Sequence, residues 1–137
     1  MQPESLEEAR DWLTRAQRDF LGAGRALSGE PILADLAVFH AQQAMEKALK
    51  AFLAAHDQPF PKTHNLERLV GLCQRIDSAF AGFMDTAHTL NPYVTQFRYP
   101  GGPLEPDVEE AREALRLASE VVNFVRQRLF PGPTSGR

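Results

Sequence analysis

The chain has 137 residues, with 15 Lys or Arg against 18 Asp or Glu, and a formal net charge of −3. This length fits one domain with a single core, and the acidic balance argues against a surface that coats nucleic acid. A single cysteine, Cys73, leaves no internal disulfide to form. With neither a membrane-length apolar run nor an apolar signal core, the sequence predicts a cytoplasmic protein without a membrane span.

Helical periodicity dominates the chain. Apolar residues at spacings of three and four predict five helices, over Leu6–Leu27, Ile32–Ala55, Leu66–Ile76, Ser78–Leu90 and Asp107–Leu129. Ser5 is the candidate N-cap of the first helix, and either Thr63 or Asn65 caps the third. Asp77 or Ser78 starts the fourth helix. Prolines and glycines between these segments predict loops.

Short connections between long amphipathic helices favour an all-α, up-and-down antiparallel bundle of four to five helices. We expect one domain over residues 1–130 and a flexible C-terminal tail over 131–137. The apolar stripes predict these core residues: Trp12, Phe20, Met45, Phe52, Leu69, Phe83, Leu115 and Val122.

The second predicted helix combines small apolar residues with a row of long polar ones. His40, Gln43, Lys47 and Lys50 gather on one side of it, away from the alanines. One interpretation is a solvated stripe, in which the lysine stems cover apolar surface and their heads reach water. The other is a binding site, because ammonium, imidazole and amide groups can hold an anion such as a phosphate. Periodicity does not separate the two.

Three phrases together, "FHAQQAMEKALKAFL", "KTHNLERL" and "YVTQFRYP", resemble HEPN domains, the higher eukaryotes and prokaryotes nucleotide-binding family. The resemblance runs from about Asp11 to Leu129. It implies a four- or five-helix up-and-down bundle that often dimerises. It also implies pairing with a minimal nucleotidyltransferase, often in a toxin–antitoxin module.

Many HEPN proteins are metal-independent ribonucleases that carry an Arg, four to six intervening residues and a His on the last core helix. None of the four histidines here has an arginine at that distance upstream, and the last predicted helix contains no histidine. The chain instead resembles the branch with Arg98-Tyr99-Pro100 and no catalytic motif. No zinc, di-iron or glycine-rich phosphate motif appears, so we expect no metal, no cofactor and no catalytic residue.

The leading hypothesis is therefore a non-catalytic binding subunit that forms a homodimer and binds a nucleotide, a minimal nucleotidyltransferase, or both. One alternative is a ribonuclease toxin with an atypical active site, although RNA is not the favoured ligand. The other is a purely structural dimerisation domain. The residues expected to contact the anion are His40, Gln43, Lys47, Lys62, His64, Arg98 and Tyr99. We expect the loops to close a pocket over the second helix, and a carboxylate such as Glu46 to compensate any buried cation.

Overall fold

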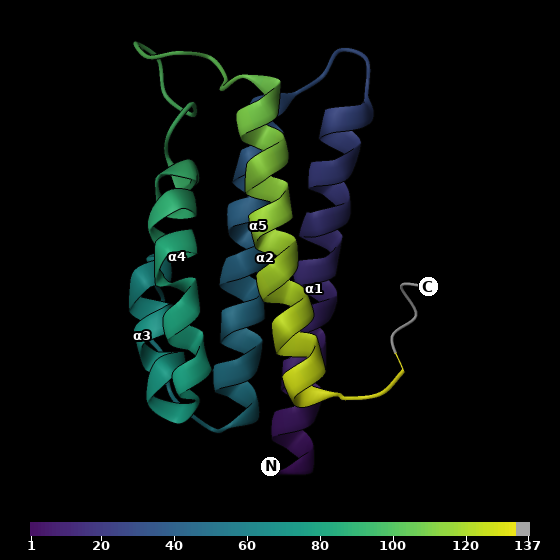
Figure 1. The fold of residues 1–137 in the computed structure, drawn as a ribbon, viewed down its shortest axis with the longest axis vertical. Helices are drawn as coiled ribbons and strands as arrows, with labels where there is room; N and C mark the ends of the chain where they lie inside the picture. Colours follow the sequence, from purple (N-terminus) through teal and green to yellow (C-terminus); the bar gives the residue numbers. More distant parts are fainter. Residues whose placement is uncertain (134–137) are drawn as a thin grey trace.

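The structure is a computed structural model that describes residues 1–133 and is a bundle of helices (Figure 1). Its α-helices are α1 (Pro3–Ser28), α2 (Ala34–Ala55), α3 (Leu66–Ile76), α4 (Met84–Leu90) and α5 (Val108–Leu129). Two short 3₁₀ helices, η1 (Ser78–Phe83) and η2 (Asn91–Val94), flank α4. The predicted all-helical bundle is confirmed. The predicted C-terminal tail falls partly on residues 134–137, which lie outside the described part of the chain.

The α2 helix lies at the centre of the bundle, between α1 on one side and α3 and α4 on the other (Figure 1). It packs most extensively on α1 and α5, and it is buried around most of its circumference. Alanines occupy many of its positions, and their small side chains allow neighbouring helices to approach closely. None of the helices in the described ranges has a stretch long and apolar enough to cross a membrane.

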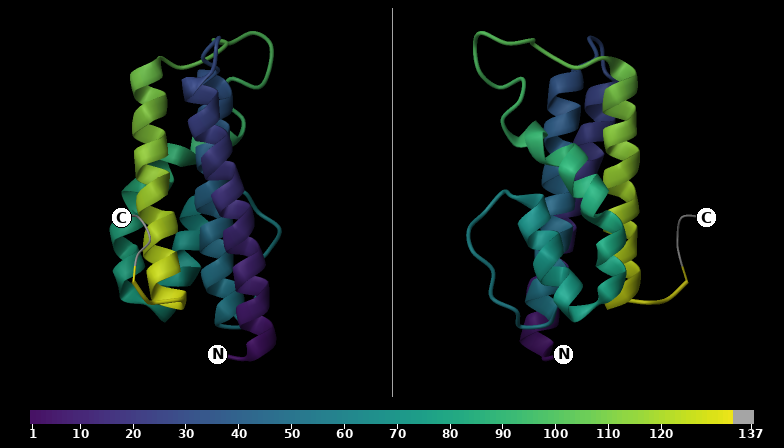
Figure 2. Two further views of the ribbon diagram at one scale, coloured as in Figure 1. Left: turned by 90° about the vertical axis from the view of Figure 1, so that its right-hand side faces the viewer. Right: turned by 60° about the vertical axis from the view of Figure 1, so that its left-hand side comes forward.

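Chain direction alternates along the bundle except between α2 and α3. Residues 56–65 form a long loop that returns along α2, so that α3 begins halfway up the molecule (Figure 2). The ring of His64, just before α3, lies against Glu46, and Cys73 further along α3 lies against Leu49. The two helices therefore run in the same direction, and the loop carries its polar residues back to the middle of α2.

The predicted core is confirmed at Met45, Phe52, Leu69 and Val122, which are all buried. Phe52 joins an aromatic cluster with Phe80, whose ring centroid lies 4.5 Å away.

Four other predicted core residues are less enclosed. Trp12, Phe20 and Phe83 are half-buried and pack against the core. The prediction for Leu115 is wrong, because this side chain is partly exposed while Ala114 beside it is buried. Both positions fit a spacing of three or four from the neighbouring alanines, and α5 is rotated so that Ala114 faces inward.

The helix ends match the predicted caps in two of three cases. The Asn65 side chain accepts a hydrogen bond from the Arg68 amide at 3.2 Å, and Asp77 accepts one from Ala79 at 3.0 Å. Ser5 is not a cap, because α1 begins at Pro3 and the Ser5 hydroxyl donates instead to the Asp57 carboxylate. The fourth predicted helix is divided into η1 and α4.

Candidate functional site

Two buried carboxylates lie beneath the polar row of α2 and bind its cationic side chains. The first is Asp19, which faces α2 from α1. Its Oδ1 atom lies 2.8 Å from His40 Nδ1, and its Oδ2 atom accepts a hydrogen bond from Lys47 Nζ at 2.6 Å. Because the two nitrogens bind the two oxygens of one carboxylate, His40 and Lys47 are held side by side.

Glu46, on α2 itself, is the second carboxylate. Its Oε1 atom lies 2.9 Å from His64 Nδ1, and its Oε2 atom accepts a hydrogen bond from Lys50 Nζ at 3.0 Å. The side-chain amides of Gln42 and Gln43 donate to Oε1 at 3.4 and 3.3 Å. Gln42 also donates to the carbonyl oxygen of His64 at 3.1 Å, which fastens the loop before α3 to α2.

The two clusters are layered, with acceptors inside and donors outside. The side chains of Asp19 and Glu46 are only 10% and 4% exposed. Above them, Lys47 is 25% exposed, His40 is 35% exposed and His64 is 65% exposed. The carboxylates therefore hold and orient the Lys47 ammonium and the two imidazole rings from below, while these nitrogen groups form the outer surface.

Each histidine directs one ring nitrogen inward and leaves the other available. A carboxylate only accepts hydrogen bonds, so Nδ1 of His40 and of His64 carries a proton. Within residues 1–133, no hydrogen bond involves the Nε2 atom of either ring, so this atom is the one left for an outside partner. Gln43 offers less to a ligand, because its amide nitrogen donates to both Gln42, at 2.8 Å, and Glu46.

Lys50 belongs to the interior rather than to the outer surface. Its ammonium lies 5.5 Å from the centroid of the Trp12 ring and 5.8 Å from that of Phe60, and it is bound to Glu46. Aromatic faces stabilise a cation at such distances. Together these contacts compensate the burial of Lys50.

The predicted site residues in the loops differ in how closely they contact the polar row of α2. The Arg98 guanidinium stacks over the ring of Phe39 at 4.1 Å, and Phe39 in turn packs edge-on against His40 at 5.3 Å. Arg98 therefore lies next to the Asp19 cluster. Tyr99 is exposed and lines a cavity of about 300 Å³ within its own loop. Lys62 is exposed, and within residues 1–133 no hydrogen bond joins it to either carboxylate.

Sequence reasoning missed Asp19 and Gln42 and left Lys50 out of the site. Asp19 stands three residues after Ala16 and four before Ala23, inside the apolar stripe of α1. A carboxylate at such a position signals a buried ion pair. Its partners on α2 follow only from the packing of the two helices.

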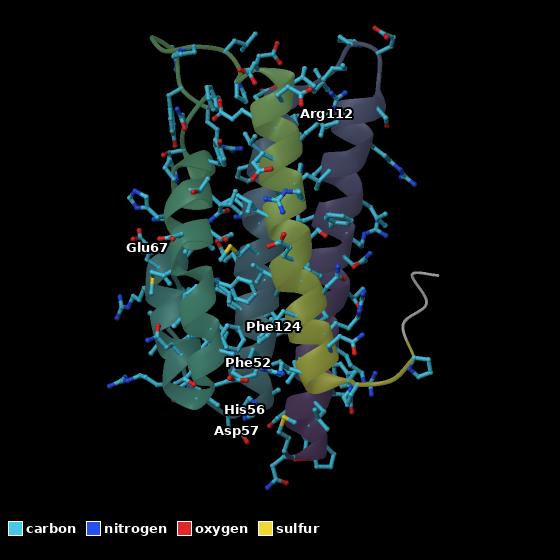
Figure 3. All side chains as sticks on the ribbon, in the orientation of Figure 1. Phe52, His56, Asp57, Glu67, Arg112 and Phe124 are labelled. Carbon is cyan, nitrogen blue, oxygen red and sulfur yellow. The ribbon has the colours of Figure 1, made fainter. Side chains whose placement is uncertain are left out.

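A separate group of polar side chains lies at the lower end of the bundle, where Figure 3 labels His56 and Asp57. Burial is the main cause that lowers the pKa of His56. The pKa of Asp77 is lowered by the hydrogen bond from the Ala79 amide and by Arg128, which donates to Asp77 at 2.8 Å. These groups anchor the start of η1 to the end of α5.

The remaining reactive side chains have structural roles. Cys73 is buried and donates to the Leu49 carbonyl, and burial raises the pKa of its thiol, which disfavours the reactive thiolate. Burial also raises the pKa of Tyr93, whose hydroxyl donates to Glu110 at 2.5 Å. Across residues 1–133, no three His, Cys, Asp or Glu side chains are grouped so as to hold a metal ion.

The fold and the site define a helical-bundle protein whose central helix carries two carboxylate-anchored clusters. A family model described as the HEPN domain matches residues 9–128. Because this match covers most of the sequence, the chain belongs to the HEPN domain family.

Two crystal structures agree with this assignment. One is an archaeal HEPN homologue with 26% sequence identity and a TM-score of 0.73, and the match covers 89% of this chain and 98% of that chain. The other is TT1696 from Thermus thermophilus, with 31% identity and a TM-score of 0.74, covering 88% of this chain and 98% of that chain. No curated relative matches this chain.

Proposed function

We propose that this HEPN protein is a non-catalytic binding subunit that holds a nucleotide phosphate on the exposed edge of α2. The observation that carries the proposal is the layering of the site, with carboxylates buried below and nitrogen donors above. Side chains that are already oriented before a ligand arrives lose little further freedom when it binds. The layering therefore favours a surface on which the Lys47 ammonium and, once doubly protonated, the two imidazole rings donate hydrogen bonds to an anion.

Lys47 and His40 form the centre of the proposed phosphate site. The Lys47 ammonium has three N–H donors, of which one binds Asp19, and its side chain is partly exposed. His40 lies beside it on the same carboxylate. Arg98, held against Phe39, adds a cation next to His40, and the exposed ring of Tyr99 in the same loop is available to stack on a base.

Phosphate binding at this site is coupled to proton uptake. When His40 or His64 is neutral, its one proton is on Nδ1 and Nε2 is an acceptor, which repels a phosphate oxygen. Each ring must gain a second proton before Nε2 can donate. Lys47 and Lys50 only balance the charges of Asp19 and Glu46, so protonation of the histidines supplies the positive charge that the cluster itself lacks.

The same proposal includes protein partners. The partner is a minimal nucleotidyltransferase in a toxin–antitoxin-like module, and the chain itself forms a homodimer. Exposed large apolar side chains support such contacts, and Ile32, Leu33 and Leu36 are grouped at the start of α2. Exposed apolar groups of this kind mark interaction surfaces.

The test is calorimetric titration of the full-length protein with ATP and, separately, with adenosine. The informative variant is His40→Asn/His64→Asn, because asparagine places its amide nitrogen near the position of Nδ1 and can keep the bond to the carboxylate while Nε2 is lost. His88→Asn is the matched control, since His88 is exposed on α4, where its Nδ1 atom lies 3.6 Å from the Glu67 carboxylate. We expect ATP to bind the wild type and the control, and to bind the double variant at least about tenfold more weakly.

Adenosine bound as tightly as ATP would contradict the phosphate site, as would equal ATP affinity in the double variant. Incubation of the protein with RNA in the absence of metal tests the claim that the subunit is non-catalytic. We expect intact RNA. Cleavage that the wild type retains after repurification would favour the ribonuclease instead.

A further inference from the structure

A second cavity is lined by residues of α1 and of the C-terminal end of α5, two helices that pack against each other and whose lower halves are visible in Figure 1. It measures about 320 Å³ and is lined by Arg10, Leu13, Thr14, Arg126 and Phe130. That volume is at the lower end of the range for small-molecule sites. Among residues 1–133, the lining consists of two guanidinium groups, one hydroxyl and two apolar side chains, and includes no carboxylate.

Both arginines are held in place by neighbours that leave their charge uncompensated. The Arg10 guanidinium stacks over the Phe130 ring at 4.0 Å, and Arg126 donates to the neutral side chain of Asn123 at 2.7 Å. By contrast, the guanidinium of Arg15, also on α1, is bound to Asp11 at 3.2 Å. Within residues 1–133, neither Arg10 nor Arg126 forms an ion pair.

The cavity also has an apolar floor. Leu13 and Phe130 belong to the core or pack against it, and each presents part of its side chain to the cavity. A ligand that fits must therefore combine an anionic group for the two arginines with an apolar body for the floor. Inorganic phosphate alone would leave the floor uncovered.

We propose that this α1–α5 cavity binds a phosphate monoester carried on an apolar or aromatic body. Two guanidinium forks and the Thr14 hydroxyl offer at least five N–H or O–H donors. A carboxylate has two oxygens and one negative charge, whereas a monoester phosphate has three terminal oxygens and about 1.5 to 2 negative charges. The phosphate therefore matches the two cations better. This site is independent of the α2 row, because it uses the face of α1 that packs toward α5.

The test uses phenyl phosphate as the probe, titrated into the full-length, nitrogen-15-labelled protein while backbone amide signals are recorded. We expect saturable shifts centred on residues 10–14 and 126–130. In Arg10→Gln/Arg126→Gln the affinity should fall at least about tenfold. The matched control is Arg68→Gln/Arg75→Gln, which removes two exposed arginines of α3 and should bind like the wild type. The amide spectra also report whether each variant is folded.

Two further ligands test the chemical class. Inorganic phosphate and benzoate should both bind more weakly than phenyl phosphate. Inorganic phosphate lacks the apolar body, and benzoate carries a carboxylate in place of the phosphate group. Equal or tighter binding of either would overturn the proposal, as would shifts that do not saturate or that survive in Arg10→Gln/Arg126→Gln. The His40→Asn/His64→Asn variant should retain phenyl phosphate binding at this cavity, so failure of the α2 site and failure of this one are distinguishable.

Discussion

Replacement of Lys50 with methionine tests the interior half of the site. Methionine keeps most of the side-chain volume but removes the ammonium that binds Glu46 at 3.0 Å and lies over the rings of Trp12 and Phe60. Removal of one partner of a buried ion pair costs about 3–5 kcal/mol. Glu46 keeps His64 and two glutamine amides as partners. We therefore expect a loss near the lower limit, about 3 kcal/mol in the free energy of unfolding.

Urea unfolding measures this loss, followed by circular dichroism and by the fluorescence of Trp12, the one tryptophan of the chain. The double variant Lys50→Met/Glu46→Gln should be more stable than Lys50→Met, because no buried carboxylate is then left without its ammonium partner. A cost of less than about 1 kcal/mol for Lys50→Met, typical of exposed ion pairs, would refute the reasoning. So would a double variant that is less stable than the single one.

Three further predictions concern stability and assembly. Phe52→Ala should lower the free energy of unfolding by about 3–5 kcal/mol in a urea titration, because Phe52 is buried against Phe80. A loss of less than about 1 kcal/mol would mean that the Phe52 side chain is not enclosed in the core. The folded-state pKa of Asp77 is lowered, so its ionised form stabilises the protein above its unfolded pKa, and that contribution is lost as the pH falls through the folded pKa. Asp77→Asn should therefore destabilise the protein at neutral pH and destabilise it less at about pH 3. Unfolding curves that show the same difference in stability between wild type and variant at both pH values would contradict the assignment. Light scattering at micromolar concentration should give the mass of a dimer, and a pure monomer would contradict the proposed homodimer.

The helices could be predicted from sequence because apolar spacing reports directly on which residues face inward. The predicted span of α3, Leu66–Ile76, is the observed one, and α2 begins two residues later than predicted, at Ala34. Rotation about the helix axis was harder to predict. In α5 both Ala114 and Leu115 fit the spacing, and the larger side chain was the wrong choice.

The site was harder to predict than the helices, because its main contacts join residues that are far apart in the sequence. Local spacing placed His40, Gln43 and Lys47 on one face of a helix, but Asp19 comes from another helix. Glu46 was foreseen as a compensating charge, and its contact with His64 depends on the long loop that returns along α2. Helical periodicity contains no information about that return.

The most direct test of the central claim is to observe the two ring nitrogens of His40 and His64 by nitrogen-15 NMR while ATP is added. The layered site predicts that Nε2 of both rings changes on saturation, through protonation and a new hydrogen bond, while each Nδ1 keeps its bond to Asp19 or Glu46. His88, exposed on α4, serves as the internal reference and should not respond. Unchanged Nε2 signals in the presence of saturating ATP, or an equal response from His88, would contradict the account.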